Sequence, residues 1–147
     1  MANPTPAGFT RWSFLWSEAR LIVAALALFL GGVPVLYAAL PVPALFGVER
    51  IILILAWVAS GLAAGYLLYQ WSAHGRKLFG GGATADTVAF FVCVVSGFNL
   101  GIAGLSGVNV GMTISSNYAV FVVVGLIYLA TAVYLYRHWA AHGKSLF

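Results

Sequence analysis

Three histidines are the residues in this sequence best suited to bind a metal ion or a haem. His74 and His142 each stand in the motif Trp-x-Ala-His-Gly, and His138 lies four positions before His142. A helix would present His138 and His142 on one face, where they could ligate zinc or copper, and His74 and His142 could together hold a haem. All three lie at the ends of apolar segments, where histidine serves equally as a helix-end cation. With no cysteine or carboxylate beside them to complete a site, we expect no cofactor and no metal.

Acidic side chains that could serve in proton transfer or catalysis are equally few. Glu18, Glu49 and Asp86 carry the only acidic side chains. A carboxylate deep in a bilayer marks an ion or proton pathway, but these three fall at the ends of apolar segments. Helix capping, or pairing with Arg20 or Arg50, accounts for them there. The sequence also lacks the arrangement of serine, histidine and acid that is typical of a nucleophilic catalyst. We therefore expect that the protein has no catalytic residues and is not an enzyme.

The elements that carry these residues are apolar helices. Of the 147 residues, 63% are apolar and 7% are charged, whereas soluble domains carry about 25% charged residues. Four long apolar segments account for the difference and leave no room for a separate soluble domain. The sequence therefore predicts an all-α membrane protein with four transmembrane helices, over residues 18–40, 48–73, 86–105 and 118–141.

Local signals set the ends of these helices. Ser17 has the side chain of an N-cap and predicts the start of the first helix. Pro34 predicts a kink or a break after Gly31 and Gly32, which neighbouring helices can accommodate in a membrane. Gly75 suits the left-handed residue that ends the second helix.

A duplication is the most specific feature of the sequence. Residues 64–79 recur as residues 132–147, with nine identities in sixteen positions at a constant offset of 68. Carried back without a gap, this offset places Glu18 opposite Asp86. It predicts two tandem helical hairpins in the same orientation, related by an approximate two-fold axis along the membrane normal. The chain then divides into an N-terminal segment (1–16), a first transmembrane hairpin (17–79), a glycine-rich linker (80–84) and a second hairpin (85–147).

The basic residues predict the orientation of the hairpins. If the four helices alternate, six bases lie on one side of the membrane and only Arg50 lies on the other. This excess predicts that both termini and the linker are cytoplasmic, and we expect a bacterial plasma (inner) membrane. Because the bases are dispersed at helix ends, they indicate contact with lipid headgroups and not with nucleic acid. The six are Arg11, Arg20, Arg76, Lys77, Arg137 and Lys144.

Small and amide-bearing residues recur every three or four positions along the third helix and its extension. Glycine lets another helix approach closely, and asparagine can hydrogen-bond across the contact. Alternatively, a broken helix would let the same residues line a pore, because irregular backbone inside a membrane is tolerated only within protein or beside water. The candidates for helix packing or for a pore are Gly97, Asn99, Gly101, Gly104, Gly107, Asn109 and Gly111, together with Gly61 and Gly65 on the second helix.

The two repeated helix ends form a second candidate surface. Each combines an indole, an imidazole and a base at the membrane boundary, a set that anchors a helix in the interface or docks a partner. These residues are Trp71, His74 and Arg76 in the first copy, and Trp139, His142 and Lys144 in the second.

These patterns favour a non-enzymatic membrane subunit. It would pack laterally through its glycine-rich faces, with copies of itself or within a larger respiratory or photosynthetic complex. The alternative is a small oligomeric channel or transporter whose path is lined by the polar glycine- and asparagine-rich segment. A redox protein that uses the paired histidines is the third possibility.

Overall fold

The computed structural model describes residues 6–147, and this part of the chain is all helical. Four of its helices are long and apolar enough to cross a membrane. The predicted all-α class is therefore confirmed, and the four apolar helices agree with a membrane-embedded protein. The elements are α1 (Pro6–Phe29), α2 (Val35–Ala39), η1 (Pro43–Leu45), α3 (Phe46–Ala73), α4 (Thr84–Ser106), α5 (Val110–Ile114) and α6 (Tyr118–Ala141).

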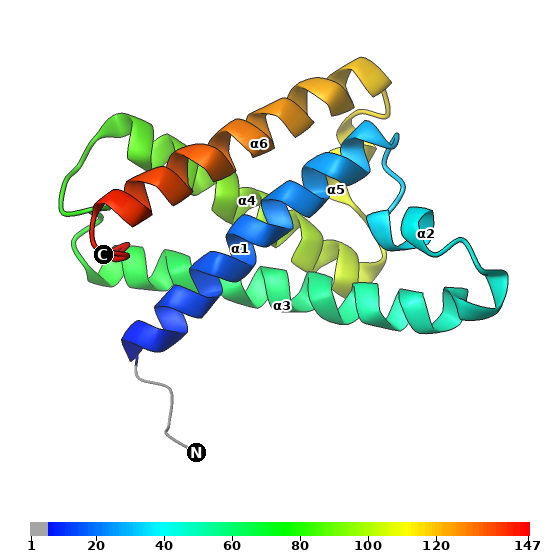
Figure 1. Ribbon diagram of the computed structural model, residues 1–147, viewed down its shortest axis with the longest axis horizontal. Coiled ribbons are helices and arrows are strands. Elements are labelled where there is room, and N and C mark those ends of the chain that lie inside the picture. The colour runs from blue at the N-terminus through cyan, green and yellow to red at the C-terminus, as the bar shows by residue number, and fades with distance from the viewer. Residues whose placement is uncertain (1–5) are drawn as a thin grey trace.

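The chain runs through a long helix, two short helices and a second long helix, and then through a long helix, one short helix and a last long helix. We call α1 to α3 the first hairpin and α4 to α6 the second. The most extensive contacts join the two hairpins, because α3 packs mainly against α4, and α1 packs mainly against α6. Figure 1 shows the start of α1, the α3–α4 connection and the C-terminus at one end of the bundle, here called the terminal end, with α2 and α5 toward the opposite end.

The first long helix begins much earlier than predicted. In the described part of the chain α1 runs from Pro6 to Phe29. Proline suits the first turn of a helix, because its fixed φ fits there and its missing N–H leaves no bond unmade. Ser17 is buried within this helix and is not its N-cap. At about 1.5 Å per residue, Arg20 stands roughly 21 Å along the helix from Pro6 and roughly 14 Å from Phe29. It is therefore not one of the bases at the terminal end, contrary to the prediction.

Two predicted chain breaks are confirmed. Gly31 and Gly32 have φ values of +74° and +89°, the left-handed region that only glycine enters without strain. The Gly32 N–H donates to the Ala27 carbonyl at 2.8 Å and closes the end of α1. Gly75, which follows the last residues of α3, has φ +69°, as the helix-end pattern predicts.

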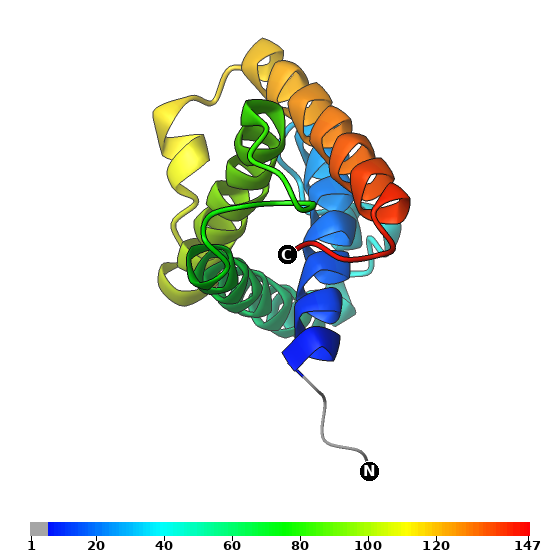
Figure 2. The ribbon, with the colours of Figure 1, turned by 90° about the vertical axis from the view of Figure 1, so that its left-hand side faces the viewer.

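The apolar core lies in the half of the bundle near the terminal end. All four long helices contribute to it, and Leu78 and Leu146 from the two end segments are also buried. The Phe79 N–H donates to the Leu146 carbonyl at 2.9 Å, which ties these segments together. Figure 2 shows the α3–α4 connection and the C-terminal segment turning across this end of the bundle. The largest buried side chains of the helices here are Phe14, Leu21, Leu67, Phe90, Leu135 and Trp139.

The burial pattern of α1 recurs on α4. Each of the seven buried positions of α1 has a buried counterpart on α4 when the numbers are shifted by 76. Phe14 thereby corresponds to Phe90, and Arg20 to Ser96. The gapless offset of 68 does not hold for this pair of helices: Glu18 lies in the interior of α1, whereas Asp86 lies in the first turn of α4.

Candidate functional site

Most of the predicted glycines lie in contacts within the chain. A Cβ added to Gly61 on α3 would stand 2.8 Å from the Cα of Gly101 on α4, and the reverse substitution gives the same distance. A Cβ on Gly97 would stand 2.7 Å from the Cβ of Ala64, and one on Gly104 would meet the α3 backbone at 3.1 Å. These faces are occupied by α3–α4 packing. They are therefore not free for lateral packing against another chain, contrary to the prediction from the sequence.

The other predicted polar and glycine positions shape the α4–α5 turn. Asn99 on α4 donates from Nδ2 to Asn109 Oδ1 at 2.9 Å, and its Oδ1 accepts from the Gly111 N–H at 3.1 Å. Asn109 also caps α5 by accepting from the Met112 N–H at 3.2 Å. Gly107 ends α4 with φ +74°. The predicted broken helix is thus a short helix that two asparagines hold against α4.

Gly65, on α3, is less tightly packed. A Cβ there would lie 3.7 Å from the ring of Phe98, an ordinary contact distance. This position does not require glycine on steric grounds, unlike Gly61 one turn earlier.

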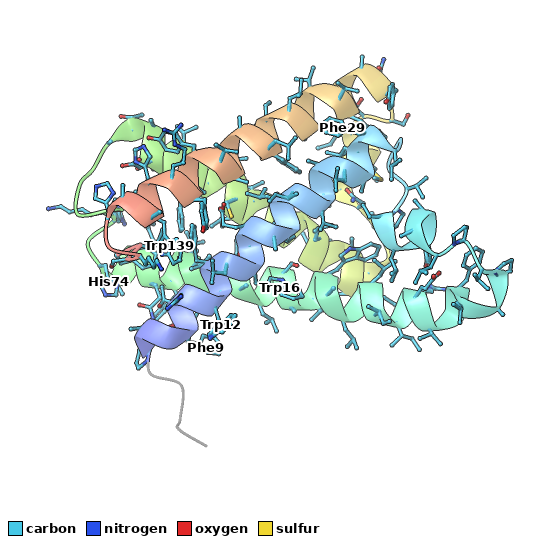
Figure 3. The ribbon with its side chains drawn as sticks, viewed as in Figure 1. Phe9, Trp12, Trp16, Phe29, His74 and Trp139 are labelled. Atoms are coloured by element: carbon cyan, nitrogen blue, oxygen red, sulfur yellow. The ribbon has the colours of Figure 1, made fainter. Side chains whose placement is uncertain are left out.

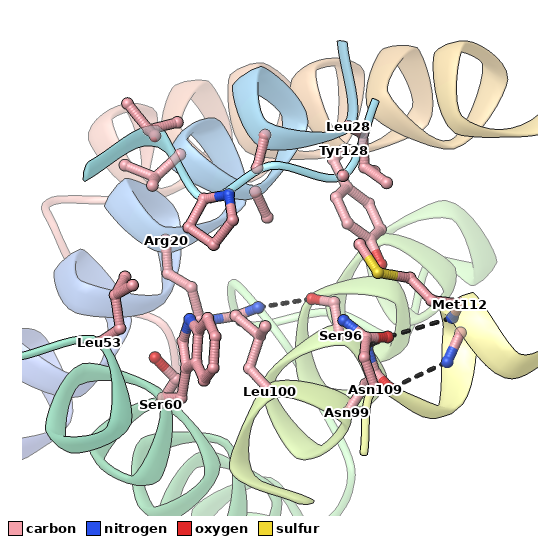
Figure 4. Close-up of a pocket in the computed structure, with 18 of the residues that line it drawn as sticks. Arg20, Leu28, Leu53, Ser60, Ser96, Asn99, Leu100, Asn109, Met112 and Tyr128 are labelled. Atoms are coloured by element: carbon pink, nitrogen blue, oxygen red, sulfur yellow. Dashed lines mark hydrogen bonds between the residues drawn. The ribbon is translucent and has the colours of Figure 1, made fainter. Parts of the chain in front are cut away.

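A cavity of about 520 Å³ lies between the helices in the half of the bundle toward α2 and α5. Its volume is in the range of small-molecule sites. Figure 4 shows Arg20 reaching toward Ser96, with Asn99, Asn109 and Met112 on the α4–α5 wall. Apolar side chains from α1, α2, α3 and α6 complete it, so the cavity is mostly apolar with a few convergent polar groups. Those polar groups belong to Arg20, Ser60, Ser96, Asn99, Asn109, Ser115 and Tyr128.

Arg20 is the charged group of this cavity, and it is 6% exposed. Its Nη1 donates to Ser96 Oγ at 2.6 Å, and its Nη2 donates to the Cys93 carbonyl at 2.8 Å. Its Nε is buried without a hydrogen-bond partner. Within residues 6–147, the one ion pair joins His138 to Asp86, so the Arg20 guanidinium has no carboxylate within salt-bridge distance.

Glu18 shares the interior of α1 with Arg20 but does not pair with it. The two residues are two positions apart, and such residues do not face each other on a helix. Glu18 is 5% exposed, and its Oε1 has no hydrogen-bond partner. The prediction that this acid lies at a helix end is wrong for the same reason as for Arg20. Pro6, a residue type favoured in the first turn of a helix, was the available sign that the helix begins well before Ser17.

The indole of Trp16 forms one edge of the cavity. Its Nε1 donates to Ser60 Oγ at 3.0 Å, and Ser60 donates to the Ala56 carbonyl at 2.7 Å. Figure 3 places Trp16 where α1 crosses α3, away from the terminal end that holds Trp139 and His74. Trp16 therefore links α1 to α3 beside the cavity. No local pattern in the sequence indicates this contact, because the two residues are 44 positions apart.

Toward the terminal end the cavity stops at the apolar core. Phe14, Leu21, Leu67 and Leu135 belong to that core and are at most 2% exposed. None of these four lines the cavity. In this structure the cavity does not extend into the core at the terminal end.

The two repeated helix ends have the same backbone geometry. Arg76 and Lys144 both have a left-handed φ, +61° and +62°. Their N–H groups donate over 2.9 Å to the carbonyls of Trp71 and Trp139, respectively. The histidines bond back in the same way: His74 Nδ1 lies 2.8 Å from the Gln70 carbonyl, and His142 Nδ1 lies 2.7 Å from the His138 carbonyl.

The phenylalanines of these ends are exchanged between the hairpins. Phe147 of the second hairpin stacks on His74 with ring centroids 5.5 Å apart, and Phe79 of the first packs on His142 at 5.4 Å. The faces of the two histidines suggested for haem are therefore packed against phenylalanine rings. Among residues 6–147 no group of three or more histidine, cysteine or acidic side chains is arranged to hold a metal ion.

Asp86 anchors a small polar cluster at the terminal end. Tyr134 donates from its hydroxyl to Asp86 Oδ1 at 2.8 Å, and His138 Nδ1 lies 3.2 Å from the same oxygen. The Tyr134 and His138 rings stack with centroids 4.2 Å apart. The cluster joins α4 to α6 and explains why Asp86 is buried.

No protein family, curated protein or solved structure matches this chain.

Proposed function

We propose that this integral membrane protein binds an amphiphilic small molecule with an anionic group in the cavity around Arg20. The observation that carries the proposal is the buried guanidinium, which lines the cavity and has no carboxylate partner among the described residues. An ionisable residue inside a membrane is costly and usually serves a binding or transport role. The role we propose is binding, without catalysis.

The chemistry of the walls defines the ligand. A carboxylate or similar acceptor group would take the unused donors of Arg20, which are oriented by Ser96 and the Cys93 carbonyl. Charge-assisted hydrogen bonds are the stronger kind, and they gain strength away from water. The apolar remainder of the cavity suits a hydrocarbon body. A medium-chain carboxylate is the simplest molecule that combines both parts.

The charges suggest from which side the ligand enters. Without Arg20, five bases remain at the terminal end and Arg50 remains near the α2–α5 end. This excess still favours a cytoplasmic terminal end. The cavity would then be reached from the opposite face of the membrane, past α2 and α5. The five bases are Arg11, Arg76, Lys77, Arg137 and Lys144.

A tandem hairpin repeat accounts for the architecture. It is supported by the matching helix ends, by the exchanged phenylalanines and by the burial pattern shared by α1 and α4. Under this proposal Arg20 and Ser96 stand at equivalent positions. The cavity is therefore asymmetric, with a guanidinium at one of these positions and a hydroxyl at the other.

The alternative functions have weaker support. A channel needs a path past the apolar core that closes the cavity at the terminal end. A laterally packing subunit would need another surface, because the glycines of α3 and α4 are used within the chain. Transport of the bound molecule remains compatible with a chamber closed on one side, since transporters alternate between such states.

Thermal unfolding in detergent tests the proposal. A ligand that binds only the folded state raises the melting temperature as its concentration exceeds the dissociation constant. We expect decanoate to raise it for the unaltered chain more than decanol does, because only decanoate is anionic. Arg20→Gln should abolish the difference, whereas Arg137→Gln, an exposed arginine on α6, should retain it. Equal shifts from decanoate and decanol in the unaltered chain would refute an anion site.

A further inference from the structure

A second pocket, of about 230 Å³, lies at the terminal end. It is formed by the first turns of α1, the end of α3 and the C-terminal segment, and it is separate from the cavity around Arg20. Figure 3 shows the labelled residues of this region, with His74 and Trp139 near the C-terminus and Phe9 on the start of α1. The polar side chains that line it are those of Thr10, Arg11, Gln70, His74, Lys144 and Ser145.

The pocket carries positive charge with no acidic side chain in its wall. Arg11 and Lys144 both line it, and neither forms an ion pair within the described part of the chain. Arg11 lies over the ring of Trp139 at 5.9 Å, a cation–π contact that holds the guanidinium at the pocket. Both basic side chains are exposed, so an anion can reach them from the membrane surface.

The corresponding place in the second hairpin is already filled by an acid. There Asp86 binds Tyr134 and His138. In the first hairpin the tyrosine at the same place, Tyr66, instead contacts Thr10 and receives a hydrogen bond from Gln70 at 2.8 Å. The two ends therefore share a framework, but one contains a carboxylate and the other contains unpaired cations.

Phosphate fits this arrangement better than a carboxylate. Arginine binds phosphate oxygens with two parallel hydrogen bonds, and lysine adds a point charge. The walls contributed by Phe14, Trp139 and Leu146 are apolar, and tryptophan and bases of this kind lie at the level of lipid headgroups. We propose that this pocket binds a phosphomonoester group through Arg11 and Lys144, carried either by an anionic lipid or by a water-soluble molecule.

Two binding measurements on the full chain distinguish these sources. Native mass spectrometry after release from phosphatidylcholine nanodiscs containing a minor fraction of phosphatidic acid reports the retained lipid. Calorimetry with inorganic phosphate, on detergent-purified protein, reports the soluble source. We expect at least fivefold enrichment of phosphatidic acid over phosphatidylcholine, or saturable phosphate binding in calorimetry. Arg11→Gln and Lys144→Gln should each reduce that signal at least fivefold.

Arg76→Gln is the matched control. Arg76 has the same left-handed backbone and the same helix-end bond as Lys144, but it does not line the pocket. A loss with Lys144→Gln and not with Arg76→Gln would assign the binding to the pocket and not to the charge of this membrane face. The proposal is overturned if neither probe binds, or if Arg76→Gln weakens binding as much as Lys144→Gln does.

Discussion

Arg20 on α1 and Ser96 on α4 meet across a hydrogen bond of 2.6 Å, and they occupy the same position in the burial patterns of the two helices. The hydrogen bond joins α1 of the first hairpin to α4 of the second. The buried guanidinium therefore stands where the hairpins meet. From this place it can take hydrogen-bond acceptors from α4 and also face the cavity enclosed by both hairpins.

Ser96→Ala should destabilise the contact between Arg20 and α4. The substitution removes the acceptor of Nη1 and leaves a buried charged donor unpaired. Hydrogen bonds to charged groups contribute about 1.5–3 kcal/mol, so we expect the free energy of unfolding to fall by roughly that amount. Denaturant unfolding in mixed micelles measures the change. Ser72→Ala, at an exposed serine on α3 that donates to the Tyr69 carbonyl, should leave stability nearly unchanged; similar losses for both variants would contradict the role of Ser96.

Gly101→Ala tests the close approach of α3 and α4. The new Cβ would lie 2.8 Å from the Cα of Gly61, and backbone cannot move aside as a flexible side chain can. Overpacking typically costs about 1–3 kcal/mol, and we expect a loss in that range in the same unfolding assay. The control is Gly47→Ala on α3, where nothing lies within 4 Å of the added Cβ. That variant should be neutral, or more stable by about 0.5–1 kcal/mol.

Tyr134→Phe removes only the hydroxyl that binds Asp86 and keeps the ring stacked on His138. We expect a loss of about 1–2 kcal/mol in the free energy of unfolding, because Asp86 is buried and loses one donor. Tyr69→Phe, at a tyrosine that is 66% exposed, should change little. No difference between the two variants would mean that the Asp86 cluster does not stabilise the α4–α6 contact.

Chemical labelling tests the one-sided cavity and its orientation. In a Cys93→Ala background, a membrane-impermeant maleimide should label Ser115→Cys, which lines the cavity beside α5, from outside intact cells. Lys144→Cys should react only after the membrane is permeabilised. Leu135→Cys, at a core position with 0% exposure, should stay unlabelled in the folded protein. Labelling of Lys144→Cys from outside would reverse the proposed orientation.

The sequence predicted most of the architecture because apolar length and glycine turns are local signals. The helix over residues 118–141 has the predicted bounds, and the breaks after Gly32 and at Gly75 occur as expected. The start of α1 was misplaced because Ser17 and Glu18 together resemble a helix beginning. The residue types alone do not show whether a serine and an acid cap a helix or lie buried within one.

The cavity could not be predicted from the sequence. Its walls come from both hairpins. A first helix that begins at Ser17 also places the charged residue of the cavity, Arg20, at the membrane surface. Asn99 and Asn109 are candidates for helix packing or for a pore from the sequence, but their hydrogen bond depends on the fold of the α4–α5 turn. The correspondence of α1 with α4 could not be seen in the sequence either, because corresponding buried positions carry different residue types. Arg20 corresponds to Ser96, and Leu21 corresponds to Gly97.

Calorimetric titration of the purified protein with decanoate tests the central claim most directly. Loss of a charge-assisted hydrogen bond of about 1.5–3 kcal/mol corresponds to about tenfold or more in affinity. We predict that Arg20→Gln, folded as judged by circular dichroism, binds decanoate at least tenfold more weakly than the unaltered chain, while Arg137→Gln binds it equally well. Undiminished binding by folded Arg20→Gln would contradict the account.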